Sequence, residues 1–105
     1  MKDFEYKIIS ELLEYTLGES FVFPESESKE DLHFSGVGYF LTLKNTEFSK
    51  ERIVLDKPDV LGKLDGIDVG FIGFIQDNEL TLECYTFNDK LTKENRTNGF
   101  KRTKT

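Results

Sequence analysis

The chain of 105 residues has a single cysteine, a single histidine, two prolines and no tryptophan. One cysteine, Cys84, cannot form an internal disulfide, which is typical of proteins from a reducing compartment. One cysteine and one histidine are also too few nitrogen and sulfur ligands for a structural zinc ion. The sequence therefore gives no reason to expect a disulfide scaffold or a zinc-dependent fold.

Long apolar runs are also lacking. No stretch approaches the roughly 20 consecutive apolar residues that cross a bilayer, and the N-terminal segment 1–5 contains acids where a signal peptide would have basic and then apolar residues. We therefore expect a cytoplasmic protein that makes no use of a membrane.

The residues that are present favour one globular domain with an uneven charge. Ten Phe and four Tyr supply enough apolar bulk for one core in a chain of this length. Residues 1–88 carry 18 acidic and eight basic side chains, a net charge of −10, whereas residues 89–105 carry six basic and two acidic, a net charge of +4. The pattern predicts a single domain over 1–88 and a polar basic tail over 89–105. We expect the tail to be a solvated chain end that makes at most loose contacts with the acidic body; the alternative is a segment that binds phosphate.

Apolar residues at helical spacing predict an amphipathic helix over 2–17, with Gly18 as its stop. They are Phe4, Ile8, Ile9, Leu12, Leu13 and Leu17.

From His33 onward the alternation of apolar and polar residues indicates strands. Strands are expected over 37–44, 52–55, 60–64, 67–76 and 79–87, with a turn at 56–59 and a short edge strand over 21–23 that Pro24 ends. Asp65-Gly66 and Asp77-Asn78 are predicted to form two-residue hairpin turns. These turns would place Lys63 opposite Asp68, Leu64 opposite Ile67, Ile75 opposite Leu80, Gly73 opposite Leu82, Phe71 opposite Cys84 and Gly70 opposite Tyr85. The fold class predicted is α+β, with the N-terminal helix packed on a four- to five-stranded antiparallel sheet as a roll.

No catalytic residue, cofactor or metal is predicted, and we expect that the protein is not an enzyme. His33 lacks a motif that would supply a nucleophile and an orienting acid, and is interpreted as a surface residue at the start of a strand. Cys84 is expected on the core face of its strand, where a thiol is usually an inert small hydrophobe.

Carboxylates provide the remaining candidate site. One cluster surrounds the turns that flank 60–64. The other is predicted to form an acidic loop before His33. Glu83 is added because it is expected to face away from the core among aromatic and apolar residues. The candidate partner-binding residues are Asp56, Asp59, Asp65, Asp68, Glu25, Glu27, Glu30, Asp31 and Glu83. These acids are either an ordinary solvated surface or a docking face that mimics phosphate for a cationic partner.

The layout of 36–43 (GVGYFLTL), 52–55 (RIVL), 70–75 (GFIGFI) and 80–85 (LTLECY) resembles that of small bacterial immunity proteins. These are encoded beside toxins of contact-dependent growth inhibition and related systems. The resemblance implies an inhibitor that binds a cognate protein toxin and protects the producing cell, with a nuclease as the expected target and no direct contact with nucleic acid. A small-ligand binding module and an oligomerising structural domain are the alternatives, and a monomer is favoured.

Overall fold

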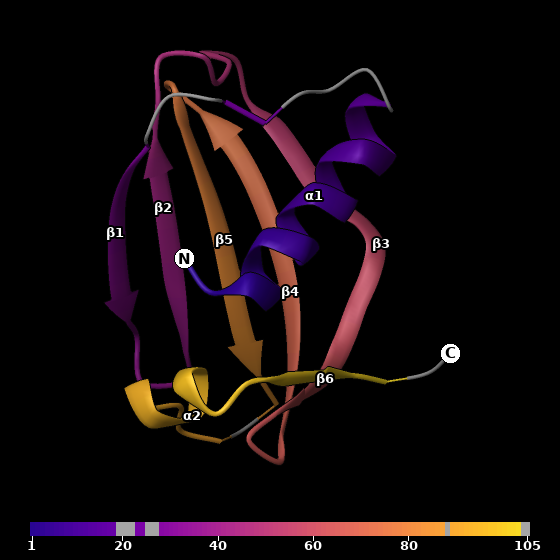
Figure 1. Ribbon diagram of the computed structural model, residues 1–105, viewed down its shortest axis with the longest axis vertical. Coiled ribbons are helices and arrows are strands. Elements are labelled where there is room, and N and C mark those ends of the chain that lie inside the picture. The colour runs from indigo at the N-terminus through magenta and orange to yellow at the C-terminus, as the bar shows by residue number, and fades with distance from the viewer. Residues whose placement is uncertain (19–22, 25–27, 88, 104–105) are drawn as a thin grey trace.

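The computed structural model describes residues 1–18, 23–24, 28–87 and 89–103. The elements follow in the order α1 (Asp3–Leu17), β1 (Lys29–Phe34), β2 (Gly38–Lys44), β3 (Ile53–Leu64), β4 (Ile67–Gln76), β5 (Glu79–Thr86), α2 (Lys93–Thr97) and β6 (Phe100–Arg102). The strands form one antiparallel sheet in the order β1-β2-β5-β4-β3-β6. The sheet curls like a half-barrel, and α1 lies diagonally across its concave side (Figure 1). The α+β class is confirmed, with six strands among the described residues instead of four or five.

Helix α1 forms where its apolar periodicity predicts. Ile8, Ile9, Leu12 and Leu13 are buried against the concave side of the sheet. At the other end, Gly18 adopts a φ of 88° and its N–H donates to the Glu14 carbonyl 2.8 Å away. Glycine reaches such a positive φ without steric cost, so the helix ends at the predicted residue.

Both predicted hairpins are confirmed. Asp65 and Gly66 have φ values of 52° and 81°, and Asp77 and Asn78 have values of 54° and 62°, which a two-residue type I′ turn requires. Because the turn length fixes the register, all six predicted cross-strand pairs are found between β3 and β4 and between β4 and β5.

Two predictions about the strands are wrong. The turn expected at 56–59 is instead an irregularity within the single strand β3, where the pairing with β4 shifts between Leu55 and Val60. The extra residues are accommodated as a bulge, which keeps the strand in the sheet. The segment 29–34, whose first residues have the composition of an acidic loop, forms edge strand β1 paired with β2. Of the edge strand expected over 21–23, positions 21–22 lie outside the described residues and Phe23 is not in a strand.

The prediction of a solvated basic tail is also wrong for most of that segment. Leu91 is buried, and its N–H donates to the Gly36 carbonyl. Strand β6 pairs with the end of β3, and Phe100 packs edge-to-face on Phe71 at 5.1 Å between ring centroids. The segment closes one end of the sheet beneath the start of α1 (Figure 1). It packs there through Leu91 and Phe100, two apolar residues in a mainly charged and polar stretch of sequence.

The core fills the space between α1 and the concave side of the sheet. It draws Tyr39 and Leu41 from β2, Leu55 from β3, and Leu82 and Cys84 from β5, all at most 1% exposed. No helix among the described residues is long and apolar enough to cross a membrane.

Candidate functional site

The side of the sheet that α1 does not cover carries a patch of partly exposed apolar side chains, which we call the open face. Its members alternate with buried core residues along each strand and therefore point to the opposite side of the sheet. Val54 and Leu61 are 44% and 41% exposed, and the others are half-buried. The open face consists of Phe40 from β2, Val54 and Leu61 from β3, Ile72 and Phe74 from β4, and Tyr85 from β5.

Glu83 lies in the middle of the open face. In the sheet register it is paired with Phe40 on β2 and with Ile72 on β4, so that apolar side chains flank it on both neighbouring strands. Its side chain is half-buried and makes no ion pair with any residue that the structure describes. Arg52 lies over the ring of Phe74, 5.4 Å from its centroid, but it forms no ion pair with Glu83. The Glu83 carboxylate is therefore available to a cation from another molecule.

Tyr85 is half-buried on the open face. Burial raises the pKa of Tyr85, and the negative charges of Asp59 and Glu83 raise it further. The ring lies over Gly70, where an added Cβ would come within 2.7 Å of Cε2, and it contacts Phe87 edge-to-face at 5.7 Å. Phe87 is 54% exposed and extends the apolar surface beyond β5.

The candidate acids do not all gather on one surface. Asp68 pairs with Lys63 at 2.8 Å across the hairpin. Asp65 in the hairpin turn accepts hydrogen bonds from the side chains of Asn95 and Asn98 at 2.9 and 3.1 Å, and so helps to fix the C-terminal segment. Glu30 accepts from the N-terminal ammonium at 2.7 Å. These three carboxylates are engaged within the molecule.

The other candidate acids differ in their position. Asp56 and Asp59 are exposed in the irregular part of β3, and Asp31 is exposed on β1. Glu25 and Glu27 lie outside the described residues. The predicted acids therefore form several separate groups, of which Glu83 and Asp59 are the two whose charges raise the pKa of Tyr85.

The two residues considered for acid–base or nucleophilic chemistry are His33 and Cys84. His33 is exposed on edge strand β1, where it is paired with Phe40 and therefore borders the open face. Cys84 is 1% exposed on β5, and burial raises the pKa of its thiol to about 12. Within the described ranges no group of three or more His, Cys, Asp or Glu is placed to hold a metal ion.

The structure also contains a buried charged cluster, formed by Glu5, Tyr39 and Arg96, that the sequence did not predict. Glu5, with no exposed surface, accepts hydrogen bonds from the Tyr39 hydroxyl at 2.6 Å and from Nε and a terminal nitrogen of Arg96 at 2.8 and 2.7 Å. The Lys2 backbone N–H donates to the same carboxylate at 2.8 Å. Arg96 also stacks over the Tyr39 ring, with 5.7 Å between its central carbon and the ring centroid. The one sequence signal for this cluster is that Glu5 falls on the apolar stripe of α1, a turn before Ile8.

The protonation states in this cluster follow from its contacts. Burial would raise the pKa of Glu5, but the hydrogen bonds from Arg96, Tyr39 and the Lys2 amide, together with the charge of Arg96, outweigh it and lower the pKa overall. Burial and the neighbouring carboxylate raise the pKa of Tyr39. The hydrogen bonds to Glu5 raise the pKa of Arg96. The cluster is therefore an ion pair plus a neutral phenol at neutral pH.

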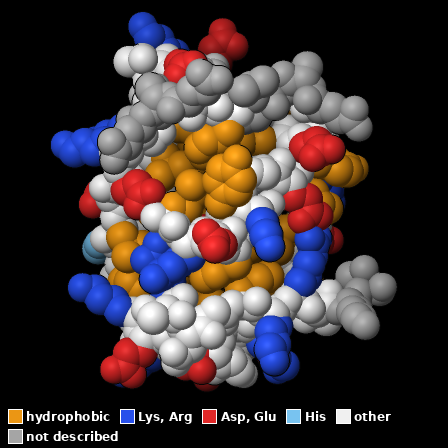
Figure 2. Space-filling view, in the orientation of Figure 1, with side chains coloured by type: hydrophobic (Ala, Val, Ile, Leu, Met, Phe, Trp, Pro, Cys, Tyr) orange, Lys and Arg blue, Asp and Glu red, His pale blue; other side chains and the backbone are white. Residues whose placement is uncertain are grey.

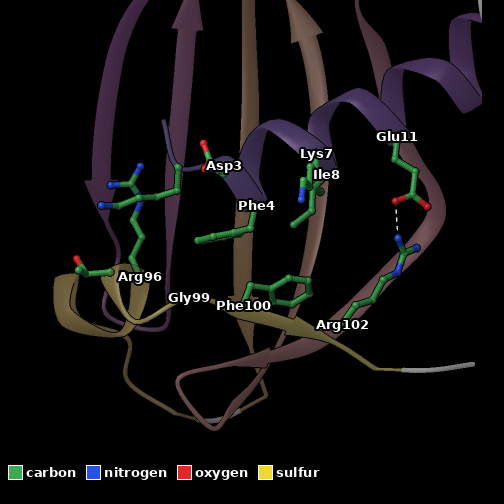
Figure 3. A pocket seen from close by; sticks show the side chains of 11 residues that line it. Asp3, Phe4, Lys7, Ile8, Glu11, Arg96, Gly99, Phe100 and Arg102 are labelled. Atoms are coloured by element: carbon green, nitrogen blue, oxygen red, sulfur yellow. Dashed lines mark hydrogen bonds and ion pairs between the residues drawn. The ribbon is translucent and has the colours of Figure 1, made fainter.

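A groove lies beside this cluster, between the first turns of α1 and strand β6 (Figure 3). Its volume is about 620 Å³. On the face that carries α1, hydrophobic side chains gather near the centre, with acidic and basic side chains among them (Figure 2). The groove is lined by Lys2, Asp3, Phe4, Lys7, Ile8, Glu11, Arg96, Thr97, Gly99, Phe100 and Arg102.

Comparison with protein-family models, with curated proteins and with solved structures finds no match for this chain. The open face, the buried cluster and the groove are therefore the basis for inferring what the protein does.

Proposed function

We propose that this protein is a cytoplasmic immunity protein that binds a cognate bacterial toxin, with a nuclease as the expected target, through the open face. The observation that carries the proposal is the placement of Glu83 between Phe40 and Ile72, without an ion-pair partner among the described residues. The resemblance to small immunity proteins supports the same class of partner.

The chemistry of the open face suits a protein partner. Apolar side chains exposed together on a sheet are typical of interaction surfaces, and aromatic residues supply much of the binding energy when a partner excludes water from them. Glu83 and Asp59 would then meet cations of the partner in a desolvated setting, where a charge-assisted hydrogen bond is strong. A nuclease binds the phosphates of its substrate with cations, so carboxylates held beside apolar side chains on a convex surface suit its active site.

The candidate acids differ in whether they already have a partner within the molecule. Asp65, Asp68 and Glu30 have partners within the molecule and would have to exchange them on binding. Glu83 and Asp59 need no such exchange, so we expect them to contribute most among the acids.

The test is co-purification and growth rescue with the toxin encoded beside the gene. We expect a complex whose affinity falls with added salt, and growth restored by the wild-type protein. Glu83→Lys should weaken binding by about 30-fold or more, since disrupting a buried interfacial charge contact costs about 2–5 kcal/mol. Asp59→Lys should lower the association rate and its dependence on salt.

The matched control is Glu14→Lys, which makes the same charge change at an exposed position of α1 on the other side of the sheet. It should bind and rescue like the wild type. Full rescue by Glu83→Lys would place the interface elsewhere, and the absence of any complex with the neighbouring toxin would overturn the proposal. A dimer that buries the open face without toxin would favour the oligomerising interpretation.

A further inference from the structure

We propose that the groove between α1 and β6 binds a small amphipathic anion, a carboxylate attached to an aromatic or branched apolar body. The groove lies on the side of the sheet that carries α1, so this inference does not depend on the open face or on the toxin. Its volume of about 620 Å³ is in the range of small-molecule sites.

One side of the groove is an apolar wall. Phe4 and Ile8 come from α1, and Phe100 faces them from β6 (Figure 3). The Phe4 and Phe100 ring centroids are 5.9 Å apart, and both side chains are only half-buried. Apolar surface that lines a concave site and remains exposed gains free energy when a ligand's apolar body displaces water from it.

The charged side chains around this wall are mainly basic. Of the ionisable side chains that line the groove, four are basic and two are acidic. Lys2 and Lys7 make no ion pair with any described residue, and the Asp3 carboxylate points away from Phe100 (Figure 3). Two uncommitted ammonium groups beside an apolar wall favour an anion over a neutral or cationic ligand of the same shape.

The groove is held open by contacts at both ends. Arg96 is fixed by Glu5 beneath the start of α1, and Arg102 pairs with Glu11 further along the helix. Between them, β6 is hydrogen-bonded to β3. A site whose walls are fixed before binding loses little conformational entropy when a ligand enters.

The experiment uses four chemically matched probes with the isotope-labelled, full-length protein. Phenylacetate carries both the ring and the carboxylate; acetate lacks the ring; 2-phenylethylamine and 2-phenylethanol replace the carboxylate with a cation or a neutral group. In NMR titrations at pH 7 we expect phenylacetate to shift amides of Phe4, Lys7, Gly99 and Phe100 saturably, with a dissociation constant of about 1 mM. The other three should bind at least about 10-fold more weakly.

Charge reversal then tests the role of the lysines. The double substitution Lys2→Glu and Lys7→Glu should weaken phenylacetate binding about 10-fold or more. Lys50→Glu, at an exposed position outside the groove, should leave it unchanged. Equal binding of the amine, shifts centred on other residues, an unaffected double variant that still folds, or no saturable shift would each overturn the inference. None of these outcomes bears on toxin binding by the open face.

Discussion

At the residue scale, Glu5 occupies the most demanding environment in the molecule. Its carboxylate has no exposed surface, and four donor groups reach it, among them two nitrogens of Arg96. A buried carboxylate is tolerated only when hydrogen bonds and an opposite charge replace its lost hydration. Glu5 therefore ties the start of α1, β2 and the C-terminal segment to one point.

Replacing Glu5 with Gln should lower the free energy of unfolding by about 3 kcal/mol, because Arg96 then lies partly buried without a counter-charge. Urea denaturation at pH 7 measures the change. Adding Arg96→Met should cost less in the Glu5→Gln variant than in the wild type, since the two residues act as a pair. Glu14→Gln on the exposed side of α1 should change the stability by no more than about 0.5 kcal/mol. Additive losses would show that the pair is not coupled.

The lowered pKa of Glu5 predicts a dependence of stability on pH. A group whose pKa in the folded protein lies below its ordinary value of 4.5 stabilises the fold fully above that value. The contribution is lost as the pH falls through the folded-state pKa. The stability difference between the wild type and Glu5→Gln should therefore be constant near neutrality and shrink below pH 4.5. Urea denaturation from pH 7 to pH 3 tests this, and a difference that does not shrink with acid would contradict it.

At the element scale, the C-terminal segment depends on a close approach of two backbones. Strand β6 is three residues long and pairs with Gly62, Lys63 and Leu64 of β3. A Cβ added at Gly62 would meet the Lys101 carbonyl oxygen and lie 2.6 Å from atoms of the Phe100 ring. Glycine at this position is what allows β6 and its aromatic ring to pack against β3.

Gly62→Ala should therefore detach β6 and destabilise the protein by about 2 kcal/mol. The Thr103 amide, which donates to the Leu61 carbonyl at 2.9 Å, should exchange its hydrogen faster by at least about 10-fold. Gly73→Ala is the comparison, because its added Cβ has no neighbour closer than 3.3 Å. Equal exchange at Thr103 in the Gly62 variant and the wild type would show that β6 accommodates the methyl group.

At the scale of the whole molecule, the fold brings part of the basic C-terminal segment onto the acidic body. The basic segment after residue 88 returns to the acidic body, where Arg96 meets Glu5 and Arg102 meets Glu11. The same segment covers one end of the core. The net charge of −10 over the first 88 residues is therefore partly compensated at the point where an acid is buried.

The thiol of Cys84 should report opening of the entire sheet. It lies 1% exposed on β5, with strands hydrogen-bonded on both sides, and burial raises its pKa to about 12. A disulfide reagent at pH 8 should react with the native protein at least about 1,000-fold more slowly than with the urea-unfolded chain. Reaction at a similar rate in both states would show local access to β5, and Glu5→Gln should speed the native reaction through its lower stability.

Local sequence determined those features that depend on neighbouring residues. The apolar stripe and Gly18 give α1 its bounds, because helical periodicity and a residue that tolerates positive φ act over a few positions. Asp65-Gly66 and Asp77-Asn78 fix two hairpins and the register of three strands, since a two-residue turn permits only one register between the strands that it joins. The inward position of Cys84 follows from that register.

Tertiary structure alone decided which distant residues meet. The residues at 56–59 favour a turn, but pairing with β4 keeps them within β3 as a bulge. The basic composition of the last residues gives no sign that Leu91 is buried and that Phe100 packs against the core. The pairing of Glu5 with Arg96 spans 91 residues and cannot be read from either end alone. Contacts at that separation arise only when the sheet brings both ends of the chain together, and they form both the buried cluster and the groove.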